Sequence, residues 1–358
     1  MSLDLKESMA EKHSKFSDAS NVAMGTYLLV AAILAMLGNS FVIEMFRRHR
    51  ELLSPTTTLL ISLAVADLGM AVFAMPFPSL SSFADGWLFE DAGCQFHGFV
   101  GIFFGLASIG NLAVISVDRY LIICRRDLLW SYRQYGGLIA VAWFNALFWA
   151  LVPIFGWSSY SLDPNGTACT INWMDNDGGY ISFVCCVFVV CFVVPIGVMC
   201  FDYYAVYRKM RKAGYSHNTS GISNIAAANE DDAGDLKDGN AYPVFDWSEA
   251  KYVTRMCIAL VIIFFISWSP YATIFLWAAF GDPTNVPIKL NGVAEAFSKA
   301  SAFLNPAVYV IMNPRYHVYI KKMLGCKTTN QQTSASLNSD RVRRRVELFS
   351  NKQQTLEV

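Results

Sequence analysis

Seven long apolar stretches constrain this chain more than any other feature of its sequence. An apolar run of roughly 20 residues is long enough to cross a lipid bilayer as a helix. Because hydrocarbon offers no hydrogen-bond partners to the backbone, such segments satisfy their amide groups internally as helices. We therefore predict an all-α membrane protein built as a seven-transmembrane helix bundle. The predicted spans are residues 23–46, 56–80, 94–120, 135–157, 178–208, 251–280 and 287–312.

The composition agrees with a membrane protein and argues against a nucleic-acid partner. Of the 358 residues, 54% are hydrophobic and only 16% are charged, a low charged fraction for a soluble protein. The formal net charge is zero, so the excess of basic residues typical of nucleic-acid-binding proteins is missing. The first 20 residues are polar and lack the basic-then-apolar pattern of a signal peptide. We expect the first apolar stretch itself to start insertion.

The charges of the connecting loops predict the orientation of the helices. Basic residues follow the first, third, fifth and seventh stretches, and acidic residues dominate the alternate loops. Cytoplasmic loops of membrane proteins carry the excess of lysine and arginine. We therefore expect a multi-pass protein of the plasma membrane with an extracellular N-terminus. The basic residues are Arg47, Arg48, Arg50, Arg125, Arg126, Arg133, Arg208, Lys209, Arg211, Lys212, Arg315, Lys321 and Lys322.

Two segments outside the spans have a recognisable composition. Residues 213–246 are rich in Gly, Ala, Asn and Asp, which predicts a disordered cytoplasmic loop. Residues 313–326 place apolar side chains on one side and cations on the other, as in a helix that lies on a membrane surface, and Cys326 is a palmitoylation candidate there. The predicted order is an extracellular N-terminal tail (1–22), the transmembrane domain (23–312), the amphipathic membrane-surface helix (313–326) and a cytoplasmic tail (327–358).

Lys299 lies in the middle of the seventh stretch. A charged side chain at that depth costs from about 2.5 to more than 10 kcal/mol, so such residues face the interior of a bundle and have a partner or a chemical task. A desolvated lysine amine can condense with an aldehyde to form a Schiff base. Glu295 lies four residues earlier, one helical turn outward on the same face. The alternative is a lysine that pairs with a carboxylate and does no chemistry.

Other polar residues recur within the apolar stretches. Asp118-Arg119-Tyr120 ends the third stretch, where an arginine can pair with its neighbouring carboxylate or extend toward lipid headgroups. Cys94 and Cys169 lie beside acidic loops, unlike the other cysteines, and are the candidate disulfide. A buried carboxylate needs partners, so we predict a polar network that could hold water or Na⁺. Its candidate members are Asn39, Asp67, Ser108 and Asn305.

The ordered set of motifs resembles that of the rhodopsin-type (class A) G-protein-coupled receptors over about residues 25–325. The runs Trp268-Ser269-Pro270 and Asn305-Pro306-Ala307-Val308-Tyr309 carry this resemblance together with Asp118-Arg119-Tyr120. It implies that Trp268 faces a ligand. It also implies a G-protein switch formed by Asp118, Arg119, Tyr120, Asn305, Pro306 and Tyr309. An acidic residue of the sixth helix often locks the arginine in this class, but Glu249 is one position early and Ala250 occupies the usual place.

Lys299 lies six residues before Asn305, the spacing at which opsins carry their retinal-binding lysine. The chain is most similar to the peropsin group of opsins. Further support comes from the runs Phe103-Phe104-Gly105, Gly156-Trp157, Cys169-Thr170-Ile171-Asn172-Trp173 and Trp277-Ala278-Ala279-Phe280-Gly281-Asp282-Pro283. The resemblance implies retinal (all-trans or 11-cis) as chromophore, held by a protonated Schiff base. It implies Trp268, Tyr271, His97, Gly105 and Trp173 as pocket residues.

A protonated Schiff base in a low-dielectric site needs a counterion, and two carboxylates compete for this role. Asp163 matches the second-loop carboxylate that serves many invertebrate-type and peropsin-like opsins, so it ranks first; the alternative is a solvated turn residue. Glu295 follows closely; the alternative is an outer-end residue that faces water. The counterion position of vertebrate visual pigments holds His97, which supplies no negative charge.

The resemblance implies a light-sensitive receptor that converts isomerisation of retinal into activation of a heterotrimeric G protein of the inhibitory class. Arrestin and a receptor kinase are further implied partners, beside membrane lipid. One alternative is a retinal photoisomerase that converts all-trans- to 11-cis-retinal with little signalling. Another is a receptor for a diffusible ligand. The sequence contains no motif that indicates a catalytic residue or a set of metal ligands.

Overall fold

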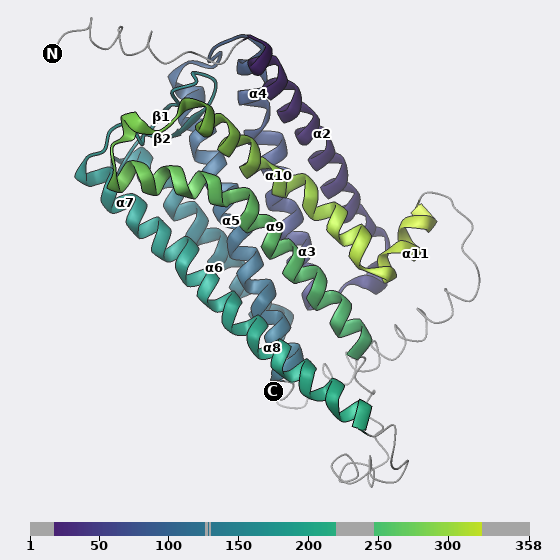
Figure 1. Ribbon diagram of the computed structural model, residues 1–358. Coiled ribbons are helices and arrows are strands. Elements are labelled where there is room, and N and C mark those ends of the chain that lie inside the picture. The colour runs from purple at the N-terminus through teal and green to yellow at the C-terminus, as the bar shows by residue number, and fades with distance from the viewer. Residues whose placement is uncertain (1–17, 126–127, 129, 220–246, 324–358) are drawn as a thin grey trace, which may run out of the picture.

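The computed structural model describes residues 18–125, 128, 130–219 and 247–323. Long helices run side by side as one bundle, with a small hairpin at one end and a short helix at the other (Figure 1). We call these the hairpin end and the α11 end. The helices are α2 (Asp18–Arg48), α3 (Pro55–Gly69), α4 (Pro76–Phe83), α5 (Glu90–Cys124), α6 (Tyr132–Leu151), α7 (Gly178–Phe188), α8 (Val194–Thr219), α9 (Trp247–Phe280), α10 (Ile288–Met312) and α11 (Pro314–Met323). The strands are β1 (Tyr160–Leu162) and β2 (Cys169–Ile171).

The prediction of a seven-helix bundle is confirmed for the described residues, although two of the seven passages are composite. The π-helical turn Met70–Ala74 joins α3 to α4, and Val189–Val193 joins α7 to α8 in the same way. Short 3-10 turns also occur at Arg50–Leu52, Val152–Phe155 and Pro283–Asn285. The wider turns allow each passage to continue past a proline, which cannot donate a backbone hydrogen bond.

Most helices extend several residues beyond the predicted spans, because the helical backbone continues into the polar residues that flank each apolar stretch. Helix α8 continues to Thr219, so residues 213–219 are helical and the predicted loop at 213–246 starts too early. Residues 220–246 lie outside the described part of the chain. Helix α2 begins at Asp18, so it also includes the last residues of the predicted N-terminal tail.

Helix α10 differs from the other passages in its polarity. Six helical segments of the described chain are long and apolar enough to cross a membrane, and α10 is not among them. It carries Glu295 and Lys299 together with buried amides and hydroxyls, which lower its mean hydropathy. The helix nevertheless packs against α2 and α9 as part of the bundle (Figure 1). Neighbouring helices therefore surround the polar groups that a lone span would expose to lipid.

The outer surface of the bundle exposes large apolar side chains. Phe144 on α6, Ile266 on α9 and Ile311 on α10 are among them. Apolar surface of this kind is unfavourable in water and is expected where the neighbour is lipid. The core between the helices is also apolar, with buried side chains from every passage packed in one cluster.

Strands β1 and β2 form an antiparallel hairpin at one end of the bundle. Gly166 adopts a left-handed backbone conformation in its turn (φ 75°), which glycine adopts without steric cost. Cys169 at the start of β2 forms a disulfide with Cys94 on α5, with Cα atoms 5.2 Å apart, so the predicted bond is confirmed. It fastens the hairpin to the third passage.

Helix α11 lies at the opposite end, as part of the predicted segment 313–326. Tyr316 is buried edge-on against Phe46, and the Tyr319 ring lies 4.8 Å from that of His49. These contacts hold α11 against the end of α2. Cys326 lies outside the described residues.

Candidate functional site

Lys299 presents a buried amine inside the bundle. Lys299 is only 6% exposed, and its Nζ lies 3.8 Å from the thioether sulfur of Met70. Gly101 on α5 faces the amine, since a Cβ built there would lie 4.0 Å from Nζ. A thioether is a weak hydrogen-bond acceptor. In the described part of the chain Lys299 makes no ion pair, so its nucleophilic atom is not committed to a carboxylate.

Both candidate carboxylates are buried rather than solvated. Glu295 lies one helical turn before Lys299 on α10, close enough to interact electrostatically with both Lys299 and Asp163. Asp163 lies at the hairpin turn, where its carboxylate accepts hydrogen bonds from the backbone N–H groups of Thr167 (3.2 Å) and Ala168 (3.3 Å). Two carboxyl groups therefore lie on the hairpin side of the amine.

Burial raises the pKa of Asp163 to about 6, because an ionised carboxylate is less stable away from water. The hydrogen bonds from the hairpin act in the opposite direction and limit the rise. The carboxylate is therefore mostly ionised at neutral pH and can serve as a negative charge.

An apolar cavity of about 660 Å³, open mouth included, lies between α5, α7 and α9. Three predicted pocket residues line it: Gly105, Trp268 and Tyr271. Gly105 is required because a Cβ at this position would overlap the ring of Trp268. The other lining residues are Ile102, Leu106, Ile171, Phe183, Val184, Val187, Phe188, Phe192, Phe264, Ala272, Phe275 and Leu276.

His97 and Trp173 are not among the residues that line this cavity. His97 is buried beside the hairpin, where its Nδ1 accepts a hydrogen bond from the backbone N–H of Cys169 (3.1 Å). Its ring packs against Trp87 and Phe77. This hydrogen bond gives His97 a contact with the β2 backbone next to the disulfide, and its ring is also close enough to Lys299 to interact electrostatically with the amine. Trp173 is buried in the core after β2.

Two further side-chain contacts fasten the hairpin over the bundle. The hydroxyls of Thr170 and Tyr271 lie 2.5 Å apart, which joins β2 to α9. The amide Nδ2 of Asn291 on α10 donates to Oδ2 of Asp163 (2.7 Å). Sequence reasoning missed Thr170 and Asn291 as partners. The available signal for Asn291 was its position four residues before Glu295, on the face that carries Lys299.

The polar network predicted at membrane depth forms around Asp67. Its carboxylate accepts hydrogen bonds from Asn305 Nδ2 (2.7 Å) and from Ser108 Oγ (3.3 Å). These contacts join α3, α5 and α10. Asn39 does not bond to Asp67; its amide donates to the backbone carbonyl of Ala302 at 2.9 Å, so it ties α2 to α10 separately.

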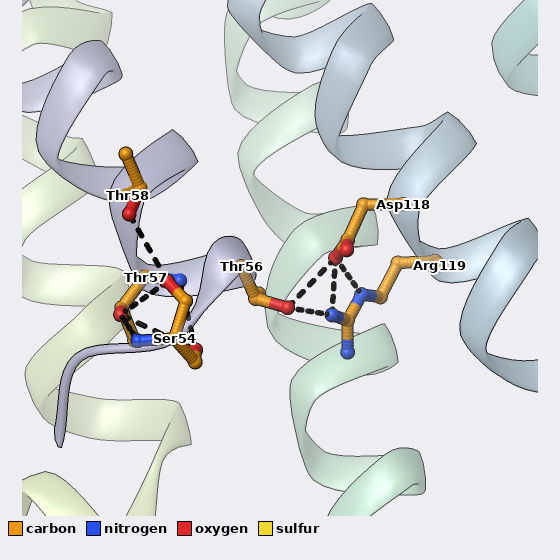
Figure 2. Close-up of polar contacts among 6 residues, drawn as sticks. All are labelled: Ser54, Thr56, Thr57, Thr58, Asp118 and Arg119. Carbon is orange, nitrogen blue, oxygen red and sulfur yellow. Dashed lines mark hydrogen bonds and ion pairs between the residues drawn. The ribbon is translucent and has the colours of Figure 1, made fainter. Parts of the chain in front are cut away.

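The Arg119 side chain is held at the α11 end by its neighbour Asp118 and by Thr56 of α3 (Figure 2). Arg119 Nε donates to Asp118 Oδ2 (3.0 Å), and a second guanidinium nitrogen forms an ion pair with the same oxygen. Thr56 Oγ1 donates to Asp118 Oδ2 (2.9 Å) and accepts from Arg119 Nη2 (2.6 Å). All three residues are buried. Sequence reasoning missed Thr56, whose partners lie 62 and 63 residues away.

The start of α3 explains why Thr56 occupies this place. Ser54 caps the helix by accepting from the N–H of Thr57 (3.2 Å), and Thr57 Oγ1 accepts from the N–H of Ser54 in return (2.7 Å). This reciprocal cap fixes the first turn of a helix. Thr58 bonds to the Ser54 carbonyl and points away from Arg119 (Figure 2). Only Thr56 of this turn reaches the ion pair in the figure.

The remaining switch residues pack at the same end. The Tyr120 ring lies 5.7 Å from that of Phe201, and Pro306 packs against Gly38 of α2. Tyr309 is buried, and its hydroxyl has no hydrogen-bond partner among the described residues. The side chain of Glu249 lies outside the described part. Ala250, Ile123 and Val206 form a small apolar cluster between α5, α8 and α9 instead of an ionic contact at that position.

Comparisons with known proteins agree with this geometry. Residues 38–309 match the family described as 7 transmembrane receptor (rhodopsin family). The chain is 37% identical to the visual pigment-like receptor peropsin of Homo sapiens over 324 residues, 90% of each chain. It is 31% identical to Opsin-5 of Mus musculus over 309 residues, which cover 85% of this chain and 76% of that protein. The crystal structure of squid rhodopsin superposes with a TM-score of 0.79 at 26% identity and covers 93% of this chain and 94% of its own. The chain therefore belongs to the opsins, within the rhodopsin family of seven-transmembrane receptors, and is a multi-pass membrane protein.

Proposed function

We propose that this opsin is a light-sensing receptor that binds retinal covalently through Lys299. The observation that carries the proposal is the buried amine, whose close contact is a thioether rather than a carboxylate. A primary amine in this state can attack the aldehyde carbon, and loss of one water leaves a C=N bond to Nζ. When bound, retinal supplies the absorption of light and the isomerisation.

The residues near Lys299 fit such a group. Gly101 leaves the space beside Nζ free of a side chain, and Gly105 with Trp268 begins an apolar, aromatic-lined cavity farther along α5. Apolar walls with few polar groups are typical of sites that bind a hydrophobic ligand. The hairpin lies over this end of the bundle (Figure 1), and Lys299 is buried below it. The amine and the cavity thus provide the two ends of one binding site.

Asp163 and Glu295 are the counterion candidates. Both are buried on the hairpin side of Lys299, and a nearby negative charge stabilises a protonated nitrogen. Asp163 ranks first because its hydrogen bonds stabilise the ionised form and hold it in place. Glu295 supplies a second carboxyl group, on the same helix as the amine.

Signalling to a heterotrimeric G protein, proposed to be of the inhibitory class, would follow release of Arg119. The Asp118–Arg119–Thr56 contact holds the guanidinium inside the bundle. A shift of α9 that begins at Trp268 would open the α11 end and free this contact. The apolar cluster of Ala250, Ile123 and Val206 offers less resistance to opening than an ion pair would. This arrangement implies an extracellular hairpin end in the plasma membrane, with arrestin and a receptor kinase as further proposed partners.

A retinal photoisomerase that produces 11-cis-retinal is the second candidate. The buried amine and the apolar cavity would serve it as well, since such a protein needs both of them but not the Arg119 contact. The intact contact around Arg119 favours signalling.

Incubation of the purified protein with all-trans- and with 11-cis-retinal tests the proposal. We expect a visible absorption band with at least one isomer, and borohydride reduction followed by peptide mapping should find a retinyl group on Lys299. A retinyl group elsewhere, or no band with either isomer, would contradict covalent binding at this residue. Light-dependent nucleotide exchange by an inhibitory-class G protein, measured beside chromatography of the extracted isomers, separates the receptor from the photoisomerase.

A further inference from the structure

Asn291 is a buried amide that belongs to none of the motifs described above. It lies in the first turn of α10, and its Nδ2 donates to Oδ2 of Asp163 at 2.7 Å across 128 residues of sequence. Both residues are buried. Hydrogen bonds to a charged group are stronger than bonds between neutral groups. The contact is therefore a strong local tie between the hairpin and α10.

Asn291 lies on the face of α10 that also carries Glu295 and Lys299. Asn291, Glu295 and Lys299 follow one another at intervals of four residues, so they lie along one face of the helix. At a rise of about 1.5 Å per residue, each step along the helix axis is about 6 Å. The amide thus holds the hairpin carboxylate at the outermost position of the row that leads through Glu295 to the amine.

The other hydrogen bonds to Asp163 come from the hairpin itself. Asn165 Nδ2 donates to Oδ2 (3.1 Å), and the N–H groups of Thr167 and Ala168 donate to Oδ1. These bonds move with the hairpin and do not fix it to a helix. Among the hydrogen bonds to the carboxylate in the described residues, the bond from Asn291 connects it to the helix that carries Lys299.

We propose that Asn291 is a positioning residue that fixes the Asp163 carboxylate relative to the amine of Lys299 and thereby sets the proton affinity of the Schiff base. The inference rests on the proposed function, because a fixed charge affects Nζ in this way only once the imine has formed. Without the amide donor, Asp163 keeps its hairpin bonds but loses its fixed distance from α10. Its ionised form also loses one stabilising contact.

Several titratable groups lie near Asp163 and Lys299 and contribute to any pH dependence of the Schiff base. They are His97 from α5, Tyr160 from the hairpin, Tyr271 from α9, and Glu295 and Lys299 from α10.

The first test uses the protein without retinal, so it does not depend on pigment formation. The pKa of Asp163 in the folded protein, about 6, lies above its ordinary value because of burial. A raised pKa means that stability from this group is present at low pH and is lost as pH rises through about 6. Asn291→Ala removes a donor to the ionised form, so it should lower the thermal midpoint more at about pH 8 than at about pH 5.

Asn285→Ala is the matched control for this test. Asn285 also donates its amide to a carboxylate, Asp282 Oδ2 at 3.3 Å, but on the exposed surface just before α10. Its effect on the thermal midpoint should be small at both pH values. An equal effect of Asn291→Ala at both pH values would overturn the proposed tie to the ionised carboxylate. If the alanine variant does not fold, Asn291→Leu removes the donor at nearly the same side-chain volume and should show the same pH-dependent loss; wild-type behaviour of that variant would overturn the proposal.

The second test uses the pigment and a double-mutant cycle. Asn291→Ala should lower the pH at which the visible band is lost by about one unit, a tenfold drop in the proton affinity of the Schiff base. In the Asp163→Asn background the same substitution should have no further effect, because its partner has lost the charge. An undiminished shift in that background would overturn the mechanism through Asp163. If the wild-type protein forms no band at all, the proposed function fails, whereas the test without retinal still decides whether Asn291 stabilises the ionised carboxylate.

Discussion

Thr56→Val should increase the activity of this opsin in the dark. Valine keeps the branched shape of threonine and removes the hydroxyl that joins Asp118 to Arg119. The ion pair between Asp118 and Arg119 remains, so the variant weakens the resting contact without leaving a charge unpaired. Because Thr56 is buried, water does not readily replace the lost bonds.

The size of the effect follows from the two bonds that are lost. Each joins the hydroxyl to a charged group, at 2.9 Å to Asp118 and at 2.6 Å from Arg119. Such bonds contribute about 1.5–3 kcal/mol each. If the variant loses the equivalent of one of them, the resting state is destabilised relative to the open state by that amount. Since about 1.4 kcal/mol corresponds to a factor of ten, the open population should rise about 10- to 100-fold.

The assay is nucleotide exchange by a purified G protein in the dark, with receptor variants at equal concentration in detergent or nanodiscs. Thr58→Val is the matched control, because Thr58 belongs to the same helical turn but bonds to the backbone of Ser54 (Figure 2). We expect dark exchange to rise with Thr56→Val and to stay near the wild-type rate with Thr58→Val. Equal rates for the two variants would refute the argument that Thr56 holds Arg119 in the resting state.

Other substitutions test the remaining contacts. Lys299→Ala should abolish the pigment band while the protein still folds, and a retained band would rule out attachment at this amine. Asp163→Asn should move absorption to the near ultraviolet at neutral pH; an unchanged spectrum, combined with loss of the band in Glu295→Gln, would assign the counterion to Glu295 instead. Replacement of Cys94 or Cys169 by serine should lower the yield of folded protein, since the bond fixes the hairpin to α5. Normal yield under oxidising conditions would contradict that role.

The passages, the disulfide and the charge at Lys299 could be predicted because each leaves a local signal. Apolar length locates a span, and an ionisable residue within one indicates a special role. The disulfide follows from the loops in which its two cysteines lie. The end of α8 and the π-helical turns before α4 and α8 could not be predicted from hydropathy. The hydropathy of a stretch does not show where a helix continues into polar residues or where one of its turns contains an extra residue.

The contacts that organise the two ends of the bundle could not be predicted from local pattern. Thr56 and Asn291 are ordinary residues at the starts of helices, and each gains its importance from a partner 62 or 128 residues away. His97 makes a further contact that local pattern does not show. Family resemblance places it in the pocket, and the structure adds that its Nδ1 accepts a hydrogen bond from the β2 backbone. Such assignments depend on which segments the fold brings together.

The polarity of α10 has a consequence for how this protein is made. On insertion scales, a charged residue near the middle of a span costs about 2.5–3.5 kcal/mol. Transfer of a newly made α10 from the translocon into lipid as a single helix is therefore unfavourable. It emerges last of the seven passages, when α2 and α9 are available to receive it. Insertion of α10 therefore depends on its packing against α2 and α9 rather than on partition into lipid. Replacement of Lys299 by an apolar residue would ease insertion of this helix and, in the same step, remove the reactive group that the bundle encloses.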